Sequence, residues 1–259
     1  MPQENPNSRG IQSIEVGFEV IAAILETPTS KSLSQIAERI KMTPSRAHSY
    51  LTSFKRVGLI AQDEDTGRYM LGSLALDLGL AALSTRDGLS HSRSMVRRMQ
   101  DSGRFNGQFF VSIWSEAGPV IVSRSEGFLD TPFEIRIGHH PSTLQTATGR
   151  VFAAFLPRNR TEGIIHRELR EADDEVSEET ISRIYESCEA TRHRGYETVN
   201  SVTIPGLIGI AVPVFDYDES LTSVITMVES AASISMHEAR QTAKQMLAMI
   251  SGDTIAESC

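Results

Sequence analysis

The run Lys41–Ile60, KMTPSRAHSYLTSFKRVGLI, constrains the fold more than any other stretch of this sequence. Thr43 followed by Pro44 is a typical helix start, because a threonine caps the first turn and proline at the first helical position has no N–H that needs an acceptor. Gly58 is a typical helix stop, since glycine readily adopts the left-handed conformation that ends many helices. The two signals predict a single helix between them.

This predicted helix has two chemically different faces. One face is apolar at helical spacing and carries Ala47, Tyr50, Leu51, Phe54 and Val57. The other face carries hydroxyls and cations but no carboxylate: Ser45, Arg46, His48, Ser49, Thr52, Ser53, Lys55 and Arg56. Lys and Arg on the outside of an amphipathic helix usually form only a solvated face, so this helix by itself does not indicate DNA binding.

Two helices are predicted ahead of the basic helix. The first covers SIEVGFEVIAAILE, with Ser13 as its N-cap and apolar residues at helical spacing at Ile14, Phe18, Ile21 and Leu25. The second is short, covers SLSQIAERIKM and has Ser34 as its cap. A tight turn at Lys41–Met42 then leads into the basic helix, which is the order of a helix-turn-helix.

A predicted β-hairpin follows the basic helix. Leu59–Gln62 and Arg68–Leu71 flank DEDTG, where Gly67 supplies a permissive backbone. Helix, short helix, turn, capped basic helix and hairpin in this order predict a winged helix-turn-helix. Such modules also mediate protein–protein contacts, so the order alone leaves both functions open.

Under the DNA-binding interpretation, the basic helix enters the major groove with its N-terminal residues nearest the bases. Ser45, Arg46 and Ser49 are expected at base edges, while Lys and Arg neutralise phosphates. Arg9, in an arm before the first helix, and Arg68, in the hairpin, are expected to reach a phosphate or the minor groove. The predicted DNA-contacting residues are Arg9, Thr43, Ser45, Arg46, His48, Ser49, Thr52, Lys55, Arg56 and Arg68.

The charge distribution restricts any DNA contact to this region. Residues 1–75 hold 8 basic and 8 acidic residues, and the remainder holds 17 basic and 25 acidic, which gives the net charge of −8. The acidic remainder is expected to repel DNA. The polar N-terminus does not resemble a signal peptide, no run is apolar enough to span a membrane, and the two cysteines form no CxxC. We therefore expect a cytoplasmic protein without a disulfide framework or zinc site.

The rest of the chain predicts an α+β domain. The expected strands are QFFVSIW, VIVSRS, PFEIRIG, GLIGIAVPVFD and LTSVITMVES, and the expected helices cover Ala147–Leu156, about Arg160–Glu171, Glu178–His193 and SMHEARQTAKQMLAMI. Short turns between strands favour an antiparallel sheet covered by helices.

The helix predicted in LGSLALDLGLAALSTRDG carries more apolar surface than a small domain can cover. A second copy of the chain and burial within its own chain explain this equally well.

Catalytic motifs are absent from the sequence: it contains no GxSxG, GxGxxG, Walker A loop or HExxH. The adjacent His139 and His140 would point to opposite faces of a strand, and a surface turn before Pro141 fits them better. Thr148 is expected to cap a helix whose free N–H groups suit an anionic ligand. A capped helix without any ligand accounts for the same residues equally well.

The sequence resembles the IclR family of bacterial transcription regulators over nearly its whole length. The resemblance is carried by SLSQIAERIKMTPSRAHSYLTSFKRVGLI, GRYMLGSLALDLG, PSTLQTATGRVFAAFLP and RGYETVNSVTIPGLIGIAVPVFD, in that order. It implies a winged helix-turn-helix over residues 1–72, a linker helix over 73–88 and a GAF-like effector-binding domain over 89–259. It further implies homodimers, often paired into homotetramers, that bind a palindromic double-stranded operator and a small organic-acid effector, without a metal or cofactor.

The resemblance also implies an effector pocket. Carried over to this sequence, its residues are Thr146, Ala147, Gly149, Asn200, Gly209 and Thr226. Polar side chains that the family often has are missing here, as at Gly209 and Val228, which predicts a larger and less polar pocket that prefers an aromatic or extended organic acid to a two- or three-carbon acid. Two other functions remain open: an enzyme with an accessory winged helix, and a ligand-binding protein–protein adaptor.

Overall fold

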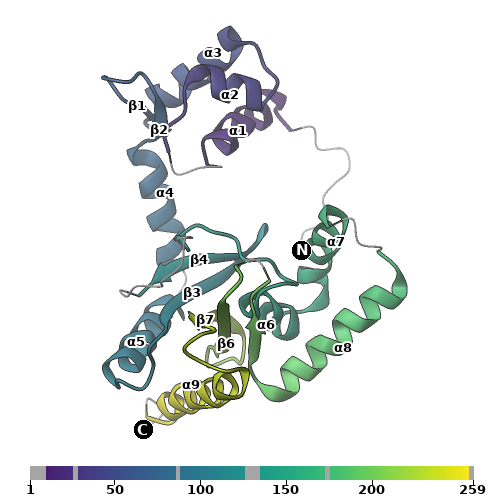
Figure 1. The fold of residues 1–259 in the computed structure, drawn as a ribbon. Coiled ribbons are helices and arrows are strands. Elements are labelled where there is room, and N and C mark those ends of the chain that lie inside the picture. The colour runs from purple at the N-terminus through teal and green to yellow at the C-terminus, as the bar shows by residue number, and fades with distance from the viewer. Residues whose placement is uncertain are drawn as a thin grey trace. The chain divides into compact units, whose positions relative to one another are not determined.

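The computed structural model describes residues 10–25, 29–85, 88–125, 135–172, 176–202 and 204–256. The chain divides into two compact units, Met1–Thr85 and Arg86–Cys259. Each unit is described by itself below, with the element labels of Figure 1.

The first unit contains three helices, a hairpin and a fourth helix. Its elements are α1 Gln12–Leu25, α2 Leu33–Arg39, α3 Pro44–Arg56, β1 Ile60–Gln62, β2 Tyr69–Leu71 and α4 Ser73–Ser84. The two strands are antiparallel, with Ile60 opposite Leu71. This confirms the predicted winged helix-turn-helix.

The predicted ends of α3 are confirmed, while two predicted caps are wrong. Thr43 is the N-cap of α3 and Pro44 begins the helix, although the Thr43 side chain makes no capping hydrogen bond. Ser32, not Ser34, caps α2, because its Oγ accepts from the Gln35 N–H (3.3 Å) while the Gln35 side chain accepts from the Ser32 N–H (3.0 Å). Ser13 cannot cap α1, since that helix already begins at Gln12.

The turn between α2 and α3 holds a non-glycine residue in the left-handed region. Lys41 has φ of 51°, and its N–H donates to the Glu38 carbonyl (3.1 Å). The left-handed conformation costs an L-residue about 1–2 kcal/mol, whereas glycine adopts it freely.

We therefore expect Lys41→Gly to raise the free energy of unfolding of this unit by up to about 1 kcal/mol, since glycine's extra freedom in the unfolded chain offsets part of the gain. Urea denaturation followed by circular dichroism measures the change. A lower stability of the variant would mean that Lys41 makes a stabilising interaction that outweighs its backbone strain.

The core of the first unit forms where α1, α2, α3 and the hairpin meet. Its buried residues are Val20, Ile21, Ala23, Ile24, Ile36, Leu51, Ile60 and Tyr69. Of the four apolar positions that the sequence placed together on α1, only Ile21 is buried; Ile14, Phe18 and Leu25 are exposed. Gly17 explains this choice of face, because the Phe54 ring packs so closely on it that a Cβ at Gly17 would lie 2.9 Å from the ring.

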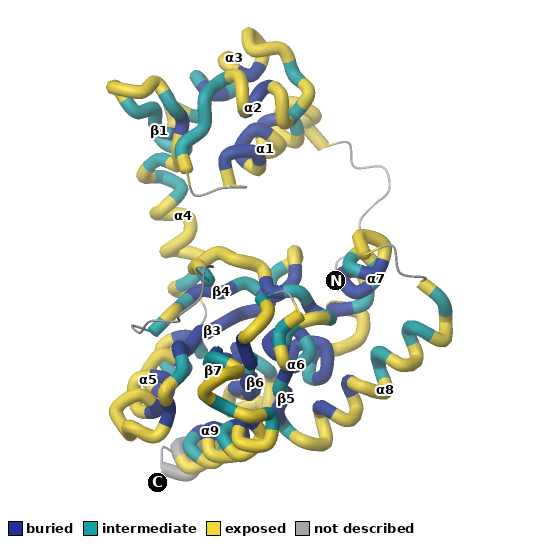
Figure 2. Tube along the Cα trace, in the orientation of Figure 1, coloured by how far each residue is buried: buried dark blue, intermediate teal, exposed yellow. Residues whose placement is uncertain are grey.

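Helix α4 leaves its apolar residues uncovered. None of its residues is buried, and Leu76, Leu78 and Leu80 are each more than half exposed. Figure 2 shows this helix in yellow and teal, in contrast to the dark blue strands of the second unit. Of the two explanations for its apolar sequence, burial within its own chain is therefore not observed among the described residues.

The second unit is built on a five-stranded antiparallel sheet with the order β4-β3-β7-β6-β5. The strands are β3 Gln108–Ser115, β4 Gly118–Arg124, β5 Glu197–Asn200, β6 Leu207–Phe215 and β7 Leu221–Ser230. The edge strand β5 was not predicted. The strand predicted over PFEIRIG is not found where it can be checked, since residues 135–138 form coil and turn, and its first part lies outside the described residues.

Helices cover both faces of this sheet (Figure 1). Alternate residues of β7 face opposite ways: Thr226 bonds to Thr148 of α6 Ala147–Phe155, and Ser223 bonds to Ser92 of α5 Gly88–Asp101. Helix α9 Met236–Ala256 also contacts α5, while α7 Arg158–Glu171 and α8 Glu178–Arg194 pack against α6. The predicted antiparallel sheet covered by helices is thereby confirmed. Within the described part of the chain, no helix has the length and apolar character that crossing a membrane requires.

Candidate functional site

The polar face of α3 is open to solvent. Ser45, Arg46, His48 and Ser49 are all exposed in the N-terminal half of the helix. Behind them, Ala47 and Leu51 are fully buried in the core of the first unit. Burial of one face thus orients the opposite face outward, with its first two turns available to a partner.

The hydroxyls on this face bond to the helix backbone. Ser49 Oγ donates to the Ser45 carbonyl (3.2 Å) and Thr52 Oγ1 donates to the His48 carbonyl (2.8 Å). Each hydroxyl oxygen keeps its lone pairs, so it can still accept a hydrogen bond from a base. Arg46 makes no hydrogen bond or ion pair with any described residue, and its guanidinium is therefore available to a partner.

Two cations near the hairpin, Lys55 and Arg68, make hydrogen bonds within the first unit, unlike Arg46. Lys55 Nζ donates to Gln62 Oε1 (2.7 Å), which joins the end of α3 to β1. Arg68 Nε donates to the Ser30 carbonyl (2.9 Å) and its Nη2 donates to Gln35 Oε1 (3.0 Å). These bonds leave Nη1 of Arg68 available for a phosphate contact. Thr43 and Arg56 are exposed, and Arg9 lies outside the described residues.

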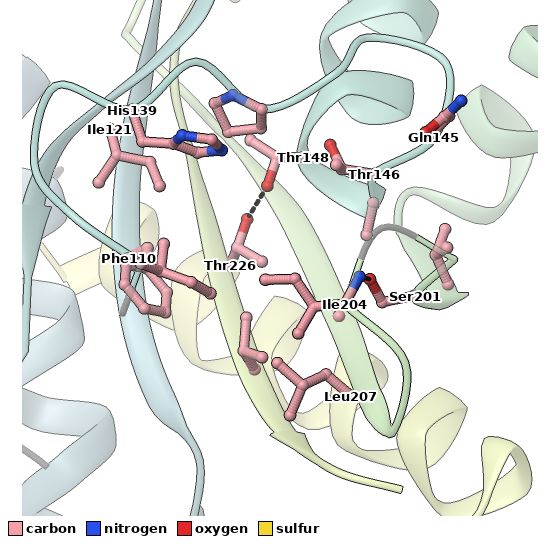
Figure 3. A pocket seen from close by; sticks show the side chains of 16 residues that line it. Phe110, Ile121, His139, Gln145, Thr146, Thr148, Ser201, Ile204, Leu207 and Thr226 are labelled. Carbon is pink, nitrogen blue, oxygen red and sulfur yellow. Dashed lines mark hydrogen bonds between the residues drawn. The ribbon is translucent and has the colours of Figure 1, made fainter. Parts of the chain in front are cut away.

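The second unit holds a pocket between the sheet and the start of α6, which we call the Thr148–Thr226 pocket (Figure 3). Its volume is about 100 Å³. Its lining residues are Phe110, Ile121, Ile135, His139, Pro141, Gln145, Thr146, Ala147, Thr148, Val199, Ser201, Ile204, Leu207, Gly209, Thr226 and Val228. Most are apolar, and no Lys, Arg, Asp or Glu is among the described lining residues.

A pair of buried hydroxyls forms the polar centre of this pocket. Thr148 Oγ1 and Thr226 Oγ1 lie 2.7 Å apart, and each residue is 5% exposed. One hydroxyl donates to the other, so the hydrogen of the second remains available for a ligand oxygen. Figure 3 shows the pair pointing toward each other from α6 and from the sheet.

The N-terminus of α6 provides further donors. Thr146 is its N-cap: Thr146 Oγ1 accepts from the Gly149 N–H (3.0 Å) and donates to the Ser142 carbonyl (2.7 Å). The predicted cap, Thr148, lies instead within the first turn and faces Thr226. The N–H groups of Ala147 and Thr148 have no acceptor within the helix, and the helix dipole favours an anion beside them.

His139 lines the pocket from the loop before α6. Desolvation by burial lowers the pKa of His139, and the neighbouring His140 lowers it further. The imidazole is therefore neutral at pH 7, where it can donate one hydrogen bond but supplies no positive charge. An anion in this pocket would depend on hydroxyls and N–H groups rather than on a cationic side chain.

The structure brings together four of the six predicted effector residues: Thr146, Ala147, Gly209 and Thr226 all line the pocket. Asn200 does not, because it is exposed while its neighbours Val199 and Ser201 line the pocket. Gly149 also lies outside the lining residues. A Cβ there would lie 2.2 Å from the Ser142 carbonyl oxygen, so Gly149 permits close packing of α6 on the preceding loop.

Sequence reasoning missed His139, Gln145, Thr148 and Ser201 as lining residues. Strand alternation offers a signal for Ser201, since side chains two residues apart share a face and Asn200 must point the other way. No sequence signal places His139, because the loop that brings it to the sheet has no periodic pattern. Its proximity results from the tertiary fold.

Two family models match the chain. The model described as the IclR helix-turn-helix domain matches residues 13–64, and the model described as the bacterial transcriptional regulator IclR C-terminal matches residues 83–253. The glycerol operon regulatory protein of Streptomyces coelicolor is 27% identical over 81% of this chain and 81% of its own length. The transcriptional repressor IclR of Escherichia coli is 22% identical over 82% of this chain and 77% of its own length.

Solved structures match over almost the full length. HmgR of Pseudomonas aeruginosa is 28% identical with a TM-score of 0.70, and the match covers 93% of this chain and 97% of that one. An IclR homolog of Microbacterium hydrocarbonoxydans, solved in complex with 4-hydroxybenzoate, has a TM-score of 0.70 over 94% of this chain and 99% of that one. It is 15% identical, so this second match bears on the fold alone.

Proposed function

Since the chain belongs to the IclR family of bacterial transcription regulators, whose members bind DNA through the helix-turn-helix domain and are not enzymes, we propose that this regulator responds to an organic acid bound in the Thr148–Thr226 pocket. The observation that carries the proposal is the pocket itself: two buried hydroxyls 2.7 Å apart beside the unpaired N–H groups of a helix start. These donors suit a carboxylate, while the remaining walls suit an apolar body. We place the protein in the bacterial cytoplasm, where it meets both DNA and metabolites.

For operator recognition we propose that α3 reads the major groove. Arg46, Ser45 and Ser49 lie on its exposed N-terminal half, which is the part of a recognition helix that reaches base edges. Lys55 and Arg56 lie at its other end, where they would contact phosphates. Arg68 would contact a phosphate through Nη1, because its Nε and Nη2 are bonded within the unit.

The same chain is proposed to act as a homodimer on a palindromic operator, with two such dimers pairing into a tetramer. Leu76, Leu78 and Leu80 of α4 supply the uncovered apolar surface that a second copy would bury. Two α3 helices would then lie about 34 Å apart, one turn of DNA. Sedimentation of the chain and of Leu78→Glu tests this, since a charge at that position would dissociate the dimer.

For the effector we propose an aromatic or extended organic acid. The ring of Phe110 and the side chains of Ile121, Leu207 and Val228 give the pocket an apolar interior that suits the body of such an acid, and the cavity of about 100 Å³ has to widen to hold an aromatic ring. The chain holds a single tryptophan, Trp114, whose ring centroid lies 5.5 Å from that of Phe152 in α6. Its fluorescence is thus a built-in probe of ligand binding at α6.

The decisive experiment selects bound sequences from random DNA in the presence and absence of an acid panel that includes 4-hydroxybenzoate, pyruvate and glyoxylate. We expect enrichment of a palindrome that an aromatic acid alters, together with a saturable change in Trp114 fluorescence. Tight binding of glyoxylate or pyruvate with no response to aromatic acids would overturn the proposed ligand class. Selection of the same DNA sequences with every acid and without acid would overturn the proposed control by a ligand.

Gly209 offers a test that separates binding from stability. A Cβ at this position would meet the Ala147 Cβ at 3.6 Å, an ordinary van der Waals contact, so alanine fits. We expect Gly209→Ala to raise the free energy of unfolding by about 0.5–1 kcal/mol, because glycine weakens a strand interior.

The same methyl group projects into the Thr148–Thr226 pocket, so the affinity for the acid of the panel that binds tightest should fall. Thermal melting and calorimetry on one preparation measure both effects. Unchanged affinity in a stabilised variant would place the ligand elsewhere.

A further inference from the structure

A second cavity lies on another side of α6. The Thr148–Thr226 pocket meets this helix at Ala147 and Thr148, whereas the second cavity meets it at Arg150 and Ala153. The volume of the second cavity is about 600 Å³, and we call it the α6–α8 groove. Its other lining residues come from the loop before α6, the end of α7 and α8: Thr143, Leu144, Leu169, Thr180, Arg183, Ile184, Ser187, Cys188 and Thr191.

The groove is positively charged in a protein whose net charge is −8. Arg150 and Arg183 line it, and no Asp or Glu is among its described lining residues. Arg183 is exposed and makes no hydrogen bond or ion pair with a described residue. Arg150 uses only Nε, which donates to the Leu144 carbonyl (2.8 Å), so both of its Nη groups remain available.

Two carboxylates that bond to residues of the groove, Glu168 and Glu197, are already engaged. Glu168 accepts from the backbone N–H groups of Thr143 (2.6 Å) and Leu144 (3.1 Å), which holds the loop over the start of α6. Glu197 is 6% exposed and accepts from Thr191 Oγ1 (2.7 Å) and Arg194 Nη2 (2.9 Å). Neither forms an ion pair with Arg150 or Arg183, so the positive charge of the groove is not neutralised from within the described residues.

Helix α8 lines the groove with a stripe of polar and charged side chains. Thr180, Arg183, Ser187 and Thr191 recur at intervals of three or four residues, which places them on one side of the helix. The stripe spans about 16 Å at the helical rise of 1.5 Å per residue. The space between α7 and α8 is lined by four glutamates, Glu162, Glu178, Glu186 and Glu189, against one arginine, Arg158, and one histidine, His166, so its charged residues are mostly acidic whereas those of the α6–α8 groove are both basic.

We propose that the α6–α8 groove binds a small anion with two or more carboxylate or phosphate groups, at a site separate from the Thr148–Thr226 pocket. Arg150 and Arg183 provide charge-assisted hydrogen bonds to the anionic groups. The hydroxyls of Thr180 and Ser187 provide further donors along the groove. The presence of two arginines favours an anion with two or more charged groups over a singly charged ion, and the site does not depend on what the other pocket binds.

Calorimetry on the full chain with citrate and, separately, inorganic pyrophosphate tests this site at matched ionic strength. We expect saturable binding of one of them, weakened about tenfold or more by Arg183→Gln, because each charged hydrogen bond contributes at least this factor. Arg150→Gln should act likewise, and thermal melting verifies that it folds. Which of the two anions binds distinguishes a carboxylate site from a phosphate site.

Two control variants locate the binding. Arg170→Gln removes an exposed arginine of α7 that does not line the groove, and Thr226→Val alters only the other pocket. Both should leave the affinity unchanged. The proposal is overturned if neither anion binds saturably, if Arg170→Gln weakens binding as much as Arg183→Gln, or if binding is lost in Thr226→Val but kept in Arg183→Gln.

Discussion

Gly149→Ala is expected to lower the free energy of unfolding of the second unit by about 3 kcal/mol, which is the upper range for forcing extra atoms into a packed interior. The added Cβ would lie 2.2 Å from the Ser142 carbonyl oxygen and 2.3 Å from Thr143 Cα. Both neighbours are backbone atoms, and Glu168 holds this loop through the Thr143 N–H. The loop therefore cannot yield without breaking that bond, and the melting temperature should fall by roughly 6–12 °C.

The same change should abolish ligand binding in the Thr148–Thr226 pocket. Displacing the loop also moves Thr146, whose Oγ1 donates to the Ser142 carbonyl and caps α6. The loss would thus be indirect, since Gly149 does not line the pocket.

Gly163→Ala is the matched control for Gly149→Ala. Gly163 lies in α7, and a Cβ there meets no heavy atom within 4 Å. Alanine should raise the free energy of unfolding by about 0.5–1 kcal/mol through its higher helix propensity. Equal stabilities of the two variants would show that the loop before α6 moves to accommodate the added Cβ. Gly149 would then again be a candidate for direct contact with the ligand.

Arg46→Ala is expected to weaken binding to the selected operator by about 1–3 kcal/mol, the contribution of one bidentate base contact. Its binding to random DNA should change far less, because the side chain would read a base edge rather than a phosphate. Arg46 makes no bond to a described residue, so its removal should leave the fold intact. Fluorescence anisotropy with both kinds of DNA measures the ratio of the affinity for the operator to the affinity for random DNA.

Lys55→Ala provides the contrast to Arg46→Ala. Its ammonium donates to Gln62 and lies at the C-terminal end of α3. At that end of the helix it would meet the DNA backbone. We expect binding to weaken evenly on all sequences, with the slope of log K against log salt concentration reduced by about one. If both variants lose the same affinity on operator and random DNA, Arg46 does not read bases.

Local signals in the sequence sufficed to predict α3. Pro44 and Gly58 mark where α3 begins and ends through their own backbone preferences, although the Thr43 side chain makes no capping hydrogen bond. The spacing of Ala47 and Leu51 against the cations determined which face is outward. The hairpin and the central strands were predictable for the same reason, because alternation and turn residues act over a few positions.

Choices between equivalent local patterns were decided by tertiary packing. Helix α1 has two apolar faces, and the buried one is the face on which the Phe54 ring packs against Gly17. The two faces differ little in local energy, so long-range contacts determine the outcome. The cap of α2 is a different case, because Ser32 stands three residues before Gln35 and their reciprocal bonds are a local signal that the sequence already carried.

The ligand pocket depended even more on the tertiary fold. The sequence by itself determined the helix that starts near Thr146 and the strand that carries Thr226, and therefore most of the donors. Only the folded chain decided that Thr148 faces Thr226, that Asn200 points away and that the loop brings His139 to the sheet. The physical reason is the distance along the chain over which each signal acts. Caps and periodicity act within a few residues, whereas this pocket joins residues as far apart as Phe110 and Val228, whose meeting depends on how the whole core packs.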